Sequence, residues 1–130
     1  MALILDTSIL IEFERKNGGI INEISKIRKV NPGVIHITLI SYFEFLLGIK
    51  ERKQSNVTKA MQFISRFPVL NAGKETARIL SDLKYNYEKK GIVLPLADML
   101  IAAQSIENNM TLVTLDKGFE RIEELNKIIL

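Results

Sequence analysis

An α/β fold, with a parallel sheet flanked by helices on both faces, is the architecture that this sequence predicts. Short apolar runs alternate with longer segments of helical spacing along the whole chain. Strands buried on both faces read as nearly continuous runs of apolar and β-branched residues, as "ALIL" and "TLVTL" do. The 130 residues, 47% of them hydrophobic, suffice for one core, so a single domain over residues 1–130 is expected.

The first half of the chain contains two expected strands and four expected helices. "ALIL" and "VIHIT" are short enough and apolar enough to be buried strands. Gly18-Gly19 and the turn "NPG" separate segments in which apolar residues recur every three or four positions. The helices that this spacing predicts cover residues 7–16, 18–30, 39–52 and 55–67.

The second half continues the alternation. "PVLN", "TLVTL" and "KIIL" are expected strands, which brings the sheet to five strands. A long helix over residues 73–91 should turn Ala77, Leu80 and Leu83 toward the core. Two further helices are expected over residues 94–109 and 116–125.

The composition excludes several classes of protein. The chain has no cysteine, which excludes disulfides and thiolate metal sites and fits a reducing compartment. Asp6 and Glu12 break the first apolar run, unlike a signal peptide, and the longest run, "ITLISYFEFLLGI", is too short to span a bilayer. A soluble, cytoplasmic protein without membrane contact is expected. The formal charge of +3 is compatible with nucleic acid but does not identify it.

Asp6 and Asp116 each follow an expected strand. Both should therefore emerge at the carboxyl edge of the parallel sheet, where open α/β sheets bind ligands. Aspartate is also a preferred residue at the N-terminus of a helix, so capping is an equal alternative for either residue taken alone.

Glu44 and Asp98 interrupt helices that are otherwise apolar. Glu44 lies in "LISYFEFLLGI" on one stripe with Ser41 and Gly48, and it should be buried. Asp98 begins a similar stripe of small and polar residues in "LADMLIAAQSI". A buried ion pair for Glu44 and a favourable contact of Asp98 with its helix dipole are the structural alternatives.

Four acidic side chains facing one sheet edge would repel each other, and a divalent cation would remove that repulsion. Oxygen ligands suit Mg²⁺ or Mn²⁺, which activate water and stabilise charge on a phosphodiester. Other sites fit less well. A receiver domain needs an early acidic pair, a haloacid-dehalogenase-type phosphatase needs an Asp where Ser8 stands, and His36 lies within a strand as a structural residue.

Four segments together resemble the PIN-domain ribonucleases of the VapC toxin type. They are "LDTSIL", "SYFEFLLG", "LADMLIAAQ" and "LVTLDKGFERI", in this order over nearly the whole chain. The resemblance implies a PIN-like domain with a parallel five-stranded sheet and endonucleolytic cleavage of RNA that depends on Mg²⁺ or Mn²⁺. It also implies a VapB-type antitoxin as partner and a homodimer.

Carried over by position, the resemblance makes Asp6, Glu44 and Asp98 the main metal ligands and Asp116 the fourth catalytic acid. Ser8 and Thr114 would be hydroxyls that border the site. The candidates for contacts with RNA phosphates are Lys117, Arg121, Lys50 and Arg52. A housekeeping RNA-processing nuclease and a catalytically inactive binding module are the alternatives that remain open.

Overall fold

A parallel four-stranded sheet forms the centre of the computed structural model, which describes residues 2–130. The strands lie side by side in the order β2, β1, β3, β4. Leu3 pairs with Ile35 on one side of β1, and Leu5 pairs with Val113 on the other. The strand bounds are Leu3–Leu5 (β1), Ile35–His36 (β2), Thr111–Thr114 (β3) and Lys127–Ile129 (β4). Asp6 thus follows an inner strand of the sheet.

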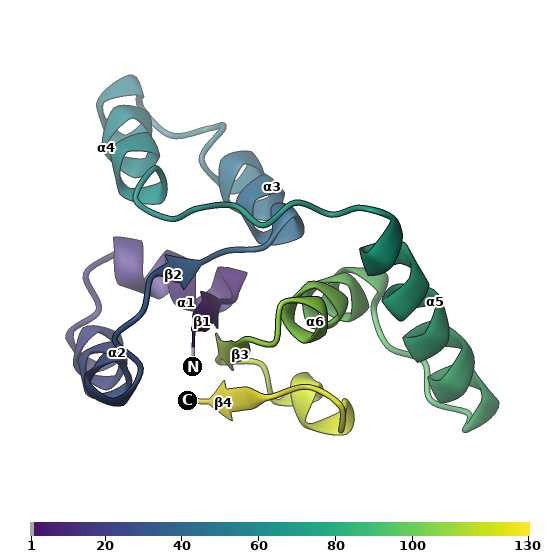
Figure 1. The fold of residues 1–130 in the computed structure, drawn as a ribbon. Coiled ribbons are helices and arrows are strands. Elements are labelled where there is room, and N and C mark those ends of the chain that lie inside the picture. The colour runs from purple at the N-terminus through teal and green to yellow at the C-terminus, as the bar shows by residue number, and fades with distance from the viewer. Residues whose placement is uncertain (1) are drawn as a thin grey trace.

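Helices cover both faces of this sheet, as expected. Helices α1 to α4 gather on one side and α5 and α6 on the other (Figure 1). Within residues 2–130 no helix combines the length and the apolar character that crossing a membrane requires. The bounds are Thr7–Glu14 (α1), Gly18–Val30 (α2), Leu39–Gly48 (α3), Gln54–Ile64 (α4), Lys74–Lys89 (α5), Leu96–Glu107 (α6) and, for a 3-10 helix η1, Lys117–Arg121.

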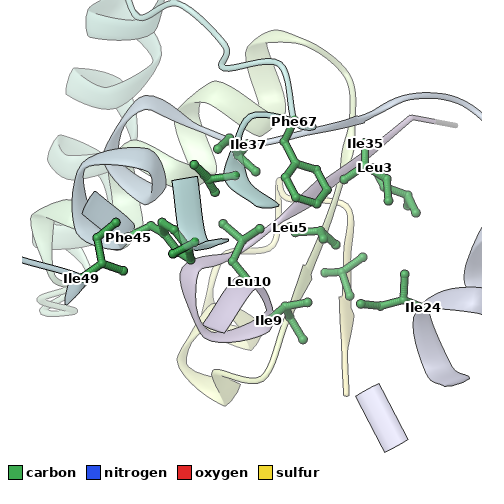
Figure 2. Packing of buried hydrophobic residues seen from close by; sticks show 13 residues of the cluster. Leu3, Leu5, Ile9, Leu10, Ile24, Ile35, Ile37, Phe45, Ile49 and Phe67 are labelled. Atoms are coloured by element: carbon green, nitrogen blue, oxygen red, sulfur yellow. The ribbon is translucent and has the colours of Figure 1, made fainter. Parts of the chain in front are cut away.

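Alternate residues of β1 point to opposite faces and so join two hydrophobic clusters. Leu3 and Leu5 belong to the cluster under α1 to α4, and Ile4 belongs to the cluster under α5 and α6. Figure 2 shows Leu10 of α1 and Phe67, which follows α4, pointing into the first cluster beside Leu5. Full burial of such side chains contributes about 1.5–3 kcal/mol each, which holds β1 and the residue after it in place.

The expected strand "PVLN" is reduced to one parallel bridge between Val69 and Ile37. Two backbone hydrogen bonds hold it, from Ile37 N to Pro68 O at 3.0 Å and from Leu70 N to Ile37 O at 2.9 Å. Proline has no N–H to donate, and β2 has only two residues, so the pairing stops there. The described sheet therefore has four strands beside this bridge.

Two further details differ from the sequence predictions. Ala77 is exposed, and the neighbouring Thr76 is buried in its place because its hydroxyl contacts the Gly73 N–H and the Glu107 carboxylate. The expected helix over residues 116–125 is only the 3-10 turn η1, in a segment that contains Gly118.

Candidate metal centre

Asp6 is buried at the end of β1, with only 6% of its surface exposed. Its Oδ1 accepts a hydrogen bond from Thr7 N at 2.8 Å and so caps helix α1. Its Oδ2 accepts hydrogen bonds from Thr114 Oγ1 at 2.6 Å and from Ser8 Oγ at 3.2 Å. The carboxylate is thus both a helix cap and the centre of a hydroxyl cluster.

Ser8 and Thr114, the two hydroxyls predicted to border the site, both contact Asp6. Each also accepts a hydrogen bond from the loop after β3: Leu115 N lies 3.2 Å from Ser8 Oγ, and Asp116 N lies 3.0 Å from Thr114 Oγ1. The two hydroxyls therefore connect the carboxylate after β1 with the loop that carries Asp116.

Glu44 is half-buried on α3 rather than fully buried as expected. The described ion pairs include none for Glu44, so the salt-bridge alternative does not describe it. Its Oε1 instead accepts a hydrogen bond from Thr7 Oγ1 at 2.7 Å, and Thr7 Oγ1 lies 3.0 Å from Ser41 Oγ. The first residue of α1 thus orients a carboxylate on α3.

Thr7 is a site residue that the sequence patterns do not identify. The motif "LDTSIL" places it next to Asp6, but its contact with Glu44 crosses 37 positions of the chain and depends on how α1 packs against α3. A threonine that directly follows an acid at the end of a strand was the available signal. Gln104 of α6 is a second residue of this kind. It is fully buried and accepts a hydrogen bond from Leu39 N, at the start of α3, at 3.2 Å, so it helps to position the helix that carries Glu44.

Asp98 lies half-buried in the first turn of α6. Burial raises the pKa of its carboxyl from 3.8 to about 6, and the negative charges of Asp116, Asp6 and Glu44 add to the effect. Burial also raises the pKa of Asp6, against the opposing hydrogen bonds from Thr114, Thr7 and Ser8. The four carboxylates therefore interact electrostatically.

Asp116 is exposed, and its Oδ1 accepts a hydrogen bond from Gly118 N at 2.8 Å. A Cβ atom at residue 118 would lie 3.1 Å from the same oxygen, so glycine gives the carboxylate room in this turn. Asp116 caps η1, as Asp6 caps α1. Asp6 and Asp116 are therefore helix caps and, at the same time, acids at the carboxyl edge of the sheet, so the two alternatives do not exclude each other.

The chemistry of this donor set fits a hard divalent cation. Among residues 2–130 no ion pair neutralises any of the four acids. Within that range no three acidic or histidine side chains lie close enough together to form the ligand set of one ion. Burial and the negative charges of Asp116, Asp6 and Glu44 raise the pKa of Asp98, and a cation of the Mg²⁺ or Mn²⁺ type would offset the repulsion.

The basic residues predicted to contact phosphates fall into two groups. Lys117 and Arg121 are exposed on η1, directly after Asp116. Lys50 and Arg52 follow α3, but only Arg52 lines the same pocket as Glu44.

Comparison with known proteins gives a consistent result. A model of the PIN domain family matches residues 3–125. The chain is 36% identical to "Ribonuclease VapC" of Rickettsia bellii, over 96% of this chain and 93% of the relative. It is 30% identical to "Ribonuclease VapC1" of Methanocaldococcus jannaschii, over 94% of this chain and 82% of that protein.

The fold is also similar to solved structures. VapBC2 from Rickettsia felis, solved bound to a DNA fragment from its promoter, has a chain that superposes with a TM-score of 0.87. That chain is 27% identical, and the match covers 100% of this chain and 99% of the other.

Proposed function

The chain belongs to the PIN domain family, and we propose that it is the ribonuclease toxin of a VapBC-type toxin–antitoxin pair, cutting RNA internally with Mg²⁺ or Mn²⁺. The observation that carries this proposal is a hydrogen-bonded set at the carboxyl edge of the sheet: Thr114 Oγ1 donates to Asp6 and accepts from Asp116 N, and Thr7, the residue after Asp6, donates to Glu44. Burial and the charges of these three acids also raise the pKa of Asp98. Four separate parts of the chain supply these acids, and no basic side chain among the described residues neutralises them.

In this proposal Asp6, Glu44 and Asp98 would hold the cation, and Asp116 is the fourth acid. A divalent cation bound there would act as a Lewis acid, which would polarise a phosphodiester and lower the pKa of a water molecule bound to it. The hydroxyls of Ser8 and Thr114 donate to Asp6 Oδ2 and fix the direction of that carboxylate. The Thr7 hydroxyl does the same for Glu44.

Cleavage of a labelled single-stranded RNA with purified protein tests this proposal. Internal cleavage should require Mg²⁺ or Mn²⁺ and should stop when EDTA is added. Cleavage that continues in EDTA, or that only Zn²⁺ restores, would contradict a site made of oxygen ligands. A protein that binds RNA and never cuts it would instead be the inactive binding module.

Thr7→Val is expected to lower the cleavage rate on the order of 10-fold, because Glu44 loses the donor that orients it. Thr7→Ser keeps the hydroxyl and should retain most of the activity. Rates at saturating Mn²⁺, together with melting temperatures for all three proteins, check this. Equal loss of activity in both variants would assign Thr7 a role in packing and not in orienting Glu44.

Helix α3 exposes an apolar stripe that supports the proposal of a homodimer. Leu39, Phe43 and Leu47 are 47%, 54% and 59% exposed, and their spacing places them on one side of the helix. Light scattering at tens of micromolar should therefore give the mass of a dimer, and Phe43→Ser should shift it toward the monomer. A wild-type protein that is monomeric at this concentration would rule the dimer out.

Expression of the chain alone is expected to arrest growth, since an uninhibited toxin would cut cellular RNA in the cytoplasm. Coexpression of a VapB-type antitoxin should restore growth, and we propose that this partner brings a basic side chain to the four acids. The Glu44→Gln variant is the control, because it should be harmless without the partner. Harmless expression of a protein that cuts RNA in vitro would favour a housekeeping RNA-processing nuclease.

A further inference from the structure

A pocket of about 210 Å³ lies between α1 and α3 and shares Glu44 with the candidate metal centre. Apolar residues of both helices form part of its lining, and Arg15 and Arg52 supply positive charge. Two guanidinium groups and one carboxylate, that of Glu44, line this pocket. Each guanidinium also has a carboxylate neighbour outside the lining, so an incoming anion would be recognised by their remaining N–H donors.

Arg52 is held in a fixed position beside the pocket. Its Nη1 donates to Glu14 Oε1 at 2.7 Å, and the two side chains are only 27% and 16% exposed. A guanidinium has five N–H groups, and this is the one hydrogen bond from them within residues 2–130. Glu14 thus orients Arg52 and leaves donors for another acceptor. Arg15 is more exposed, and its carboxylate neighbour Glu12 lies 3.8 Å away.

Gly48 keeps the α3 wall of the pocket open. A Cβ atom at this position would meet no other atom within 4 Å, so a larger side chain would extend into free space. Gly48 is the last residue of α3, where glycine is not required by a positive φ angle. A larger side chain at residue 48 therefore fits without strain in the backbone, and because Gly48 lines the pocket it would narrow the pocket's mouth.

We propose that this pocket binds a backbone phosphate of the RNA strand next to the phosphodiester that is cut. The inference rests on the proposed ribonuclease function and adds the place where the substrate is held. Arginine fits phosphate because its planar fork donates two parallel hydrogen bonds. A pocket with two arginines favours an anion over the basic side chain of a protein partner, and its position beside Glu44 suits a phosphate adjacent to the reacting one.

Steady-state kinetics on a short single-stranded RNA, with Mn²⁺ saturating, tests this inference. Arg52→Gln and Gly48→Leu should each raise KM about 10-fold and change kcat by no more than about twofold. Arg52→Gln should also reduce the salt dependence of RNA binding by about one phosphate contact. Arg28→Gln, which removes an exposed positive charge on α2, is the matched control and should leave KM near the wild-type value.

Several results would overturn the inference while leaving the proposed function intact. An active wild-type protein whose KM is unchanged by both Arg52→Gln and Gly48→Leu would show that RNA does not use the pocket. Variants that keep KM but escape inhibition by the coexpressed antitoxin would assign the pocket to the protein partner. Gly48→Leu guards against a folding artefact, because it adds a side chain in open space and leaves the Arg52–Glu14 pair in place. A wild-type protein that cuts no RNA would instead refute the proposed function itself.

Discussion

Glu44→Gln is expected to reduce RNA cleavage on the order of 100-fold or more, with no loss of folded protein. The substitution removes a negative charge and one anionic oxygen ligand but keeps the length and shape of the side chain. The amide oxygen can still accept the hydrogen bond that Thr7 Oγ1 donates at 2.7 Å. The substitution therefore removes one charge from the candidate metal centre and from the neighbouring pocket without changing the shape of either.

Glu51→Gln is the matched control for this experiment. Glu51 follows α3, is exposed, and forms none of the described ion pairs, so the same chemical change there should leave the cleavage rate near that of the wild type. Cleavage rates in Mn²⁺ and circular dichroism spectra of the three proteins decide the outcome. A Glu44→Gln protein that cuts RNA at the wild-type rate would remove Glu44 from the catalytic set.

Asp98→Asn is expected to stabilise the metal-free protein at neutral pH. The folded-state pKa of Asp98 is about 6 and its ordinary value is 3.8. A carboxyl whose pKa is raised by folding disfavours the folded state wherever it is ionised there. After allowance for its partial exposure to solvent, the cost at pH 7 is about 1–2 kcal/mol, and removing it should raise the melting temperature on the order of 5 °C in EDTA.

The effect depends on pH with a definite sign. The destabilisation is complete above pH 6, declines as the pH falls through the folded-state pKa, and is absent below the ordinary value of 3.8. The parent protein should thus gain stability in EDTA between pH 7 and pH 5, and the advantage of Asp98→Asn should shrink over the same interval. Mn²⁺ should stabilise the parent by mass action and the variant less.

Asp82→Asn serves as the control for the melting experiments. Asp82 is an exposed aspartate of α5 whose ion pair with Arg78, at 3.2 Å, is open to solvent, so its loss should change stability little at either pH. An Asp98→Asn protein that melts below the parent in EDTA would mean that the Asp98 carboxylate stabilises the first turn of α6 and that repulsion from the other acids does not destabilise the folded state.

The elements of the fold were predictable because their signals are local. The apolar run before Asp6 and the helical spacing after it identify β1 and α1 from the sequence alone. That the expected strand "PVLN" forms only a single bridge could not be predicted, because its pairing depends on the length of β2, which the sequence does not reveal. The burial of Thr76 in place of Ala77 likewise follows from contacts with Gly73 and with Glu107, which lies 31 positions away.

In the candidate site, too, some residues could be predicted from local sequence signals and others could not. The acids could be found because each one interrupts or ends an apolar segment. Thr7 as a partner of Glu44, and Glu14 as a partner of Arg52, could not be found because each contact joins α1 to α3 or to the segment after it. Such contacts depend on the relative position of two helices, which is a property of the packed core.

Diffraction from crystals soaked in Mn²⁺, with data collected at the manganese absorption edge, tests the central claim most directly. We expect an anomalous peak at the carboxyl edge of the sheet, with oxygen atoms of Asp6, Glu44 and Asp98 among its ligands, and no such peak in Glu44→Gln crystals. A well-ordered structure with the four carboxylates in place and no manganese between them would contradict it.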